Sequence, residues 1–350
     1  MSVVVIGVSA FLAFFISALL TRNFSNPLYK LQILDHPNER SLHSVPVPRT
    51  GGLAICAAIF VVAPIIAVAL KADTSLIAIL IGALVVSAIS FLDDRFTLNA
   101  SIRFLVHVGV AALLLITGYS LSVFEMPQWQ WQWPMVVGVI ISLLYIVWLV
   151  NLYNFMDGMD GFAGGMAVIG FVTFAILGLQ ADELLYATLC LVIASSALGF
   201  LVFNFPPAKI FMGDVGSSTL GFLVAAFSLW ASRDGLFPLW VAILVFSPFI
   251  VDATITLVRR IFRGERVWEA HRSHYYQRLV QLGWGHRRTV LWEYLLMILC
   301  GVSAIAATKM DGALQWVLLI IWIMIYSILI YYINRLEFRH KNCTYISTNI

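Results

Sequence analysis

The sequence has few charges and none of the cysteine patterns that would organise a secreted or zinc-stapled fold. Charged residues make up only 11% of 350 residues, whereas 61% are hydrophobic. This balance excludes an ordinary soluble domain and indicates a polytopic membrane protein. The four cysteines are scattered and form no CxxC pair, which excludes a disulfide framework and a cysteine-based zinc site. No low-complexity tract or repeat period is present.

The first apolar run, residues 3–21, lacks a basic segment before it and a small-residue cleavage site after it. A secretory signal peptide carries both features. We therefore interpret this run as a membrane span that stays in the protein.

Eleven apolar stretches are long enough to cross a bilayer, which takes about 20 residues each. They lie at residues 3–21, 51–70, 76–92, 103–120, 135–151, 162–180, 184–203, 215–231, 236–258, 290–308 and 314–333. Lys71, Arg233 and Lys309 fall in one set of alternate loops, and the other 18 of the 21 basic residues fall in the opposite set. The positive-inside rule then predicts a periplasmic N-terminus and a cytoplasmic C-terminus.

The predicted fold is an all-α integral membrane bundle of about eleven helices, in which residues 1–350 form a single membrane-embedded domain. Five polar loops are predicted on its cytoplasmic side. They lie at residues 22–50, 93–102, 151–161, 204–214 and 259–289. Outside, the loop at 122–134 carries Trp129, Trp131 and Trp133, which favour the membrane interface over a sugar-stacking role.

Asp157 and Asp160 stand where a membrane span ends, three residues apart and therefore on one face of a continuing helix. Gly158 and Gly161 allow a ligand to approach the backbone closely. Carboxylates at such a position are costly unless they bind a metal or a cationic partner. Asn154 lies in the same stretch.

Three further aspartates, Asp93, Asp94 and Asp214, are predicted on the same side of the membrane. Adjacent carboxylates such as Asp93 and Asp94 repel each other unless a cation is near. The competing interpretations are helix-end solvation for this pair and helix capping for Asp214.

The basic residues of these loops are candidates for binding phosphate. Arg49 is held between Pro48 and a glycine pair, Arg103 follows the Asp93 loop, and Lys209 precedes Asp214. The 259–289 loop adds the densest set, from which we single out His271, Arg272, His274 and Arg278. Such density suits phosphates or anionic lipid headgroups.

Carboxylates delivered by separate loops beside basic residues are what a magnesium-dependent phosphoryl-transfer site requires. Mg²⁺ takes oxygen ligands, commonly one or two carboxylates completed by phosphates and water. Basic side chains supply the countercharge for the substrate phosphates. Because the chain shows no soluble nucleotide-binding domain, we expect the acceptor to be a lipid at the membrane surface.

Four motifs carry a resemblance to a known family. They are HSVPVPRTGG at 43–52, the Asp93 and Asp94 pair, NFMDGMDG at 154–161 and FMGDVGS at 211–217. In this order the chain resembles the polyprenyl-phosphate N-acetylhexosamine-1-phosphate transferases, the family of the peptidoglycan translocase and of enzymes that start O-antigen and teichoic acid linkage. The resemblance covers essentially the whole chain.

The resemblance implies a role for each acidic residue. Asp214 is a principal ligand of Mg²⁺, with Mn²⁺ as an alternative ion, and Asp157 and Asp160 hold the uridine diphosphate or support the metal. Asp93, with Asp94 beside it, orients or deprotonates the lipid phosphate. A phosphate monoester has a second pKa of about 6, so much of the acceptor is already dianionic at neutral pH. The metal role of Asp214 is therefore better founded than the base role of Asp93.

The implied reaction joins a UDP-N-acetylhexosamine to undecaprenyl phosphate at the bacterial inner membrane and releases UMP. Many relatives carry clustered histidines where this chain has Tyr276 and Gln277. That difference resembles the branch that starts O-antigen and lipopolysaccharide with a 6-deoxy sugar such as N-acetylfucosamine or N-acetylquinovosamine. The alternative is transfer of N-acetylglucosamine for another cell-wall polymer. Apart from the bilayer, a homodimer is compatible with the sequence, and no nucleic acid partner is indicated.

Three other classes of membrane protein use similar residues. An intramembrane aspartyl protease needs GxGD, but Phe211 replaces its first glycine. An ion-coupled transporter would place its carboxylates near mid-membrane. A CDP-alcohol phosphotransferase has Ala-Arg after its Asp-Gly repeat, whereas Phe162 and Ala163 follow here.

Overall fold

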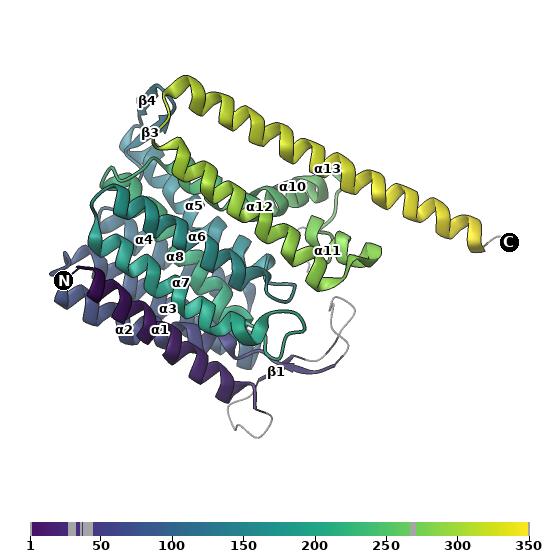
Figure 1. Cartoon of the computed structure of the whole chain (residues 1–350), viewed down its shortest axis with the longest axis horizontal. Helices are drawn as coiled ribbons and strands as arrows, with labels where there is room; N and C mark the ends of the chain where they lie inside the picture. The colour runs from purple at the N-terminus through teal and green to yellow at the C-terminus, as the bar shows by residue number, and fades with distance from the viewer. Residues whose placement is uncertain (1, 27–32, 36, 38–44, 267–270, 349–350) are drawn as a thin grey trace.

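The computed structural model describes residues 2–26, 33–35, 37, 45–266 and 271–348. The helices are α1 (Ser2–Phe24), α2 (Gly51–Ala69), α3 (Ser75–Phe96), α4 (Ala100–Ile116), α5 (Met135–Phe155), α6 (Phe162–Gln180), α7 (Leu184–Asn204), α8 (Gly213–Arg233), α9 (Leu239–Val245), α10 (Ser247–Phe262), α11 (Tyr275–Leu279), the π-helical turn η1 (Val280–Trp284), α12 (Gly285–Ala307) and α13 (Gly312–Thr348). The predicted all-α polytopic membrane fold is confirmed (Figure 1).

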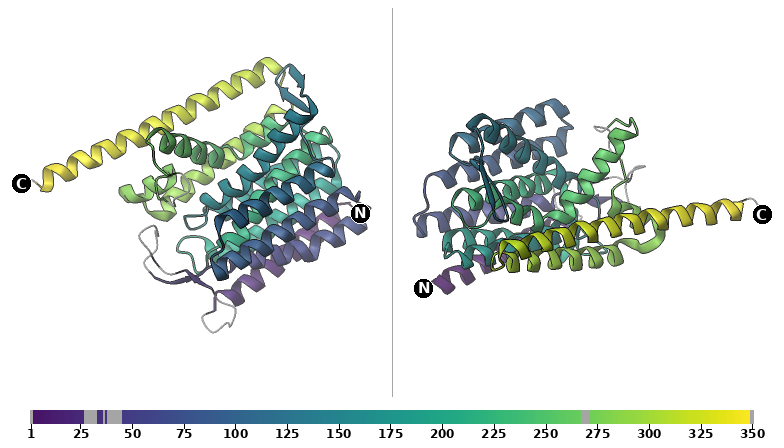
Figure 2. Two further views of the ribbon diagram at one scale, coloured as in Figure 1. Left: turned by 180° about the vertical axis from the view of Figure 1, so that it is seen from behind. Right: turned by 90° about the horizontal axis from the view of Figure 1, so that it is seen from above.

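Each of the eleven predicted spans has a helical counterpart. Within the described residues, nine helices are long and apolar enough to cross a membrane, and α4 is apolar but shorter. The span predicted at 236–258 is not continuous, because α9 and α10 meet at a bend of 83°. Pro248 at the start of α10 has no N–H and therefore cannot continue the backbone hydrogen bonds of α9, which explains the break. Figure 2 shows α10 turned away from the main bundle.

The centre of the bundle is α8, in which 94% of the residues in an apolar stretch of 18 are buried. It packs against α5, α3 and α2. Its first turns consist largely of glycine and serine, so neighbouring backbones can approach it closely. At Gly221, for example, an added Cβ would lie 2.5 Å from the Leu149 carbonyl oxygen.

By contrast, α13 lies at the edge of the bundle, and only 6% of the residues in its apolar stretch of 18 are buried. Its 37 residues correspond to a length of roughly 55 Å, more than a hydrocarbon core of about 30 Å requires. Figure 1 shows its C-terminal part extending beyond the other helices. That end of the bundle also carries α11 and β1.

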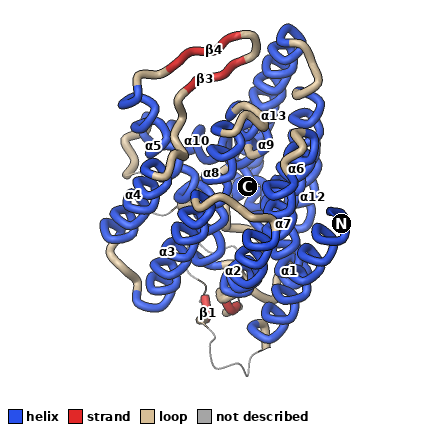
Figure 3. Tube along the Cα trace, turned by 90° about the vertical axis from the view of Figure 1, so that its left-hand side faces the viewer, coloured by secondary structure: helices blue, strands red, loops and turns tan. Residues whose placement is uncertain are grey.

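Two short two-stranded antiparallel sheets were not predicted from the sequence. The 122–134 loop folds as a hairpin of β3 (Val123–Met126) and β4 (Trp129–Gln132), visible at one end of the molecule in Figure 3. At the opposite end, β1 (Leu34–Asp35) pairs with β2 (Val47–Pro48). The alternating tryptophans stack along the hairpin, with 5.6 Å between the ring centroids of Trp131 and Trp133.

The segment after β2 docks onto the segment before α8 through backbone hydrogen bonds. Gly51 and Gly52 donate their N–H groups to the carbonyl oxygens of Phe211 and Met212, at 3.0 and 2.7 Å. An added Cβ at Gly52 would overlap the backbone nitrogen of Gly216. Glycine is thus the residue that lets two motifs, about 160 residues apart in the chain, pack backbone to backbone.

We expect Gly52→Ala to destabilise the protein, by about 2 kcal/mol on the scale of overpacked cores, because two backbones must separate to admit one methyl group. The measurement is the thermal unfolding midpoint of the purified protein in detergent. Gly109→Ala is the matched control, since an added Cβ there meets nothing within 4 Å. Equal midpoints for the two variants would contradict the close approach.

Candidate active site

Three helix ends bring acidic residues together at the end of the bundle that carries β1, and a fourth, the start of α4, adds an arginine. Asp93 lies in the last turn of α3, and Asp214 is the second residue of α8. Arg103 in α4 lies between them, 2.5 Å from Asp93 Oδ2 and 3.4 Å from Asp214 Oδ2. The other Asp93 oxygen accepts the Leu98 N–H at 2.7 Å. Both oxygens of Asp93 therefore already have donors.

Asp94 is the most deeply buried of the group, with 2% of its side chain exposed. Its Oδ1 lies 3.5 Å from Arg49 Nε, and its Oδ2 accepts the Val215 N–H at 3.4 Å. Arg49 also donates to the Asp94 carbonyl oxygen at 2.5 Å. Asp94 thus links three motifs by binding Arg49 and the first turn of α8, rather than facing an open space.

Asp157 follows the end of α5, and no side-chain donor contacts its carboxylate within the part of the chain that the structure describes. Burial raises the pKa of Asp157 well above its ordinary value. The neighbouring carboxylates of Asp214, Asp94 and Asp160 raise it further. A group in this position is destabilised as an anion until a cation reaches it.

Asn154, in the last turn of α5, stands beside Asp214 and donates to Ser217 Oγ at 3.1 Å. Ser217 was not singled out from the sequence, although it lies within the last of the four motifs. The amide of Asn154 brings a neutral oxygen donor to a group of carboxylates.

Asp160 has two partners that tie neighbouring segments together. Its Oδ2 accepts the Ala208 N–H at 3.0 Å, and its Oδ1 lies 3.1 Å from Nδ1 of His286 at the start of α12. Asn204 reinforces this connection by accepting the Gly161 N–H and donating to the Ile210 carbonyl oxygen, both at 2.9 Å. Sequence reasoning missed His286 and Asn204, because nothing in their local pattern indicates a distant partner.

The donor set fits a hard divalent cation. Asp214, Asp157 and Asn154 offer oxygen atoms only, the ligands that Mg²⁺ and Mn²⁺ prefer. In the described ranges, no three acidic, histidine or cysteine side chains are close enough to enclose an ion by themselves. Protein ligands of Mg²⁺ commonly number one or two, with phosphates and water completing the shell. The residues therefore suit an ion that arrives with a phosphate-bearing substrate.

Five predicted phosphate-binding residues do not join this cluster. Lys209 is exposed, and no side-chain contact places it at the carboxylates. Arg272 and Arg278 line a separate cavity between α10 and α13. The Nδ1 atom of His271 shares a hydrogen bond of 2.8 Å with Ser273 Oγ. Burial and, to a smaller extent, the neighbouring His274 and Arg260 lower the pKa of His271 to about 4. The His271 ring is thus neutral at pH 7 and brings no positive charge to a phosphate.

His274 is positioned by Asp252 of α10, a residue that the sequence did not assign to the site. The His274 Nδ1 lies 3.2 Å from Asp252 Oδ1, and the same carboxylate accepts the N–H groups of Tyr275 and Tyr276 at 2.9 and 3.1 Å. Asp252 therefore anchors the beginning of α11. Through Tyr276, whose hydroxyl donates to the Phe155 carbonyl oxygen at 3.3 Å, α11 packs beside the Asp157 loop.

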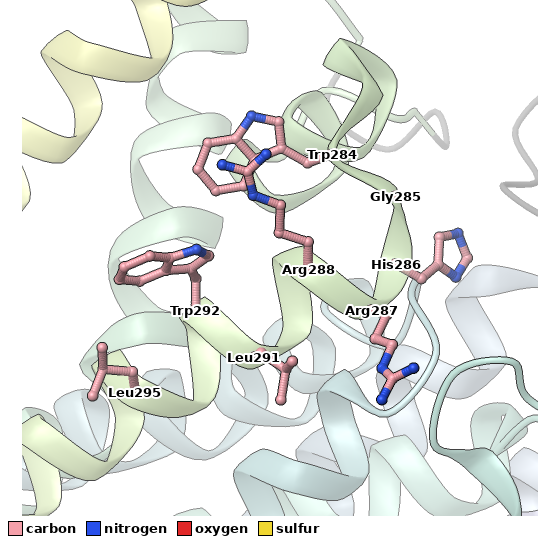
Figure 4. A pocket seen from close by; sticks show the side chains of 8 residues that line it. All are labelled: Trp284, Gly285, His286, Arg287, Arg288, Leu291, Trp292 and Leu295. Atoms are coloured by element: carbon pink, nitrogen blue, oxygen red, sulfur yellow. The ribbon is translucent and has the colours of Figure 1, made fainter.

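A larger cavity of about 670 Å³ lies on the outer face of α12, away from the acidic cluster. Its walls are formed by Trp284, Gly285, His286, Arg287, Arg288, Leu291, Trp292 and Leu295 (Figure 4). The Arg288 guanidinium lies 4.2 Å from the Trp284 ring centroid. Figure 4 shows these two side chains next to each other. One residue of its wall, His286, is also the partner of Asp160.

Comparison with known proteins decides the family. The model of glycosyl transferase family 4 matches residues 76–232. A probable undecaprenyl-phosphate N-acetylglucosaminyl 1-phosphate transferase of Bacillus subtilis (strain 168) is 36% identical over 323 residues, which cover 89% of this chain and 88% of the relative. The chain belongs to glycosyl transferase family 4.

Two further relatives of this glycosyl transferase family 4 protein are more distant. The decaprenyl-phosphate N-acetylglucosaminephosphotransferase of Mycobacterium leprae (strain TN) is 31% identical over 310 residues, covering 80% of this chain and 77% of its own. The undecaprenyl-phosphate alpha-N-acetylglucosaminyl 1-phosphate transferase of Escherichia coli (strain K12) is 24% identical over 315 residues, covering 87% and 85%. The resemblance seen in the four motifs is thereby confirmed at the level of the family.

We expect Asn204→Leu to lower stability by about 3 kcal/mol. It leaves the buried Gly161 N–H and Ile210 carbonyl without partners, at about 1–3 kcal/mol for each unsatisfied group. The free energy of unfolding, measured by denaturant titration in detergent, checks this. Asn151→Leu is the control, because the Asn151 amide donates only to Val147 of its own helix. A loss no larger than in the control would show that Asn204 does not hold the two loops together.

Proposed function

We propose that this protein transfers an N-acetylhexosamine 1-phosphate from a UDP-sugar to a polyprenyl phosphate, and that UMP is the other product. The observation that carries the proposal is the gathering of Asp93, Asp94, Asp157 and Asp214 with Arg49 and Arg103 at one end of the helix bundle. The three relatives, whose names describe transferases acting on undecaprenyl or decaprenyl phosphate, support the same reaction class.

In this proposal Asp214, Asp157 and Asn154 hold Mg²⁺, or Mn²⁺ in its place. The bound ion supplies charge neutralisation for the diphosphate, so that an anionic acceptor can approach it. Asp160 has its oxygens engaged by Ala208 and His286, and it keeps the Asp157 loop in place. Arg103, between Asp93 and Asp214, offers its remaining donors to substrate phosphate.

We assign Asp93 a positioning role rather than that of a general base. Its two carboxylate oxygens bind the Leu98 N–H and Arg103, so taking up a proton would remove the charge that holds Arg103. The acceptor has little need of a base, because the second pKa of a phosphate monoester is about 6. Holding Arg103 against two anionic phosphates is the more useful contribution.

The proposed orientation follows the distribution of basic residues, with the N-terminus periplasmic, the C-terminus cytoplasmic and the acidic cluster at the inner surface of the bacterial inner membrane. This arrangement gives the site access to a soluble nucleotide sugar and to a lipid acceptor in the same leaflet.

We expect Asp214→Asn to reduce turnover by about a thousandfold or more, because the loss of a metal-ligand charge removes several kcal/mol of transition-state stabilisation. The assay is UMP release from UDP-N-acetylglucosamine by membranes containing the protein, which should require both Mg²⁺ and undecaprenyl phosphate. Asp73→Asn, in an exposed loop, is the control for the loss of one carboxylate and should retain activity.

Near-normal turnover in the Asp214→Asn variant would refute the metal assignment. The products also separate the rival classes. A CDP-alcohol enzyme would release CMP, a protease would act without Mg²⁺, and a transporter would work without undecaprenyl phosphate.

For the sugar, we propose N-acetylglucosamine, the sugar that the names of the three relatives give for their own reactions. Tyr276 was the basis for predicting a 6-deoxy sugar, but its ring is fully buried against Phe162 and offers no open face. The O-antigen role stays a prediction from resemblance. We expect kcat/KM to be higher for UDP-N-acetylglucosamine than for UDP-N-acetylfucosamine or UDP-N-acetylquinovosamine in the same UMP assay. The reverse order would restore the 6-deoxy interpretation.

A further inference from the structure

The arginines of α10 and α11 surround a small cavity that faces α13. It has a volume of about 130 Å³. Its walls are formed by Thr256, Arg259, Arg260, Arg263, Arg272, Ser273, Arg278, Gln281 and Glu337. Sites for drug-sized ligands usually measure about 300–1,000 Å³, so this cavity is too small for a nucleotide sugar. Its size suits a single phosphate group.

One guanidinium in the cavity wall is buried with free donors. Arg278 is 7% exposed, and its Nη2 donates to Asn334 Oδ1 at 2.7 Å and pairs with Glu337. Its Nε and Nη1 have no hydrogen-bond partner among the described residues. Leaving donors of a buried charged group unsatisfied is costly, so the Arg278 guanidinium, which also lies 4.7 Å from the Tyr275 ring centroid, keeps unmet hydrogen-bonding capacity in the wall of a cavity that it helps to line.

The carboxylates near the cavity do not neutralise it. Five arginines line the wall together with one glutamate, Glu337. Glu265 adds a second carboxylate, 2.8 Å from Arg260 Nε and 3.9 Å from Arg263 Nη1. Counted over the described residues, five positive charges stand against two negative ones, an excess that attracts a phosphate.

The cavity adjoins a wider hollow with exposed aromatic side chains nearby. A wider hollow of about 390 Å³ shares Arg259, Arg263 and Glu337 with it and is also lined by Phe338. Phe262 is 86% exposed at the end of α10, and Phe338 is 66% exposed on α13. The apolar segment of α13 ends here, which is the level of the membrane interface.

We propose that this cavity binds the phosphate of an anionic phospholipid. The phosphodiester occupies the space at Arg278, the rest of the headgroup fills the wider hollow, and the acyl chains extend along the exposed apolar side chains. This site lies between α10, α11 and α13, whereas the acidic cluster is built from the ends of α3, α4, α5 and α8. It explains why Arg272 and Arg278 belong to the basic loop and yet do not reach the carboxylates.

The bound phosphate also connects the lipid to the active site through α11. Arg278 joins α11 to α13, and Tyr276 of the same helix packs against Phe162 and the Phe155 carbonyl beside the Asp157 loop. Neutralising the arginines fixes the relative position of α10, α11 and α13. The protein is therefore stabilised in membranes that contain anionic phospholipid.

The test measures lipid binding without using the transfer reaction. The full-length protein is placed in nanodiscs of phosphatidylcholine with increasing mole fractions of phosphatidylglycerol, and the unfolding midpoint is followed by intrinsic fluorescence. We expect a saturable rise in the midpoint for the wild type. Arg263→Gln should shift the half-saturating mole fraction upward roughly fivefold, as expected for one arginine near an anionic surface. Arg278→Gln should shift it further.

Arg335→Gln is the matched control, because it removes one arginine from α13 without altering the cavity wall. Arg263→Gln keeps the test decisive if Arg278→Gln fails to fold, since Arg263 is exposed and its ion pair with Glu265 is long. The proposal is overturned if Arg263→Gln and Arg335→Gln respond alike to phosphatidylglycerol. It is equally overturned if inorganic phosphate in pure phosphatidylcholine reproduces the wild-type rise, which would assign the cavity to a soluble anion. Neither outcome depends on the proposed transfer reaction.

Discussion

The end of the bundle that carries the acidic cluster depends on how the cost of gathering several carboxylates at low dielectric constant is offset. Like charges repel strongly in such surroundings, and each buried carboxylate also loses hydration. Arg49 offsets this cost at Asp94, and Arg103 offsets it at Asp93 and Asp214. Asp157 lacks such a partner among the described residues, so its charge is neutralised either by a proton, as its raised pKa favours, or by a bound cation. The uncompensated member of the cluster is therefore the one with the clearest need for a cation.

Compensation of this kind requires segments far apart in the chain to be held at fixed distances. The glycines at 51, 52, 213 and 216 provide this by allowing the Arg49 segment to pack directly on the start of α8. Asp94 then reaches both Arg49 and the Val215 N–H. The same geometry places Asp214 at the first turn of α8, where the N-terminal end of the helix dipole favours a negative charge.

The helices and the acidic cluster were predictable because their signals are local. An apolar run of about 20 residues identifies a span, and four motifs with their order identify the family. The partners of Asp252, Asp160 and Arg278 could not be predicted, since each lies in a separate helix and no periodicity relates the members of a pair. The bend between α9 and α10 had a local signal in Pro248, but an apolar stretch of span length outweighed it. The residues predicted to bind phosphate included arginines at the acidic cluster and arginines at the separate cavity, because no sequence pattern separates Arg49 and Arg103 from the arginines near Arg278.

The division between those two groups follows from where carboxylates are available. Arg49 and Arg103 stand among aspartates, so much of their charge is matched within the protein, and their hydrogen-bond geometry is fixed before any substrate arrives. In the part of the chain that the structure describes, the arginines around Arg278 outnumber the carboxylates beside them, which leaves an excess of positive charge. A preorganised, nearly neutral arrangement suits selective binding of a transition state, because its groups need not move as charge develops. An arrangement with excess charge suits a ligand that is always present at high concentration, such as the membrane surface itself.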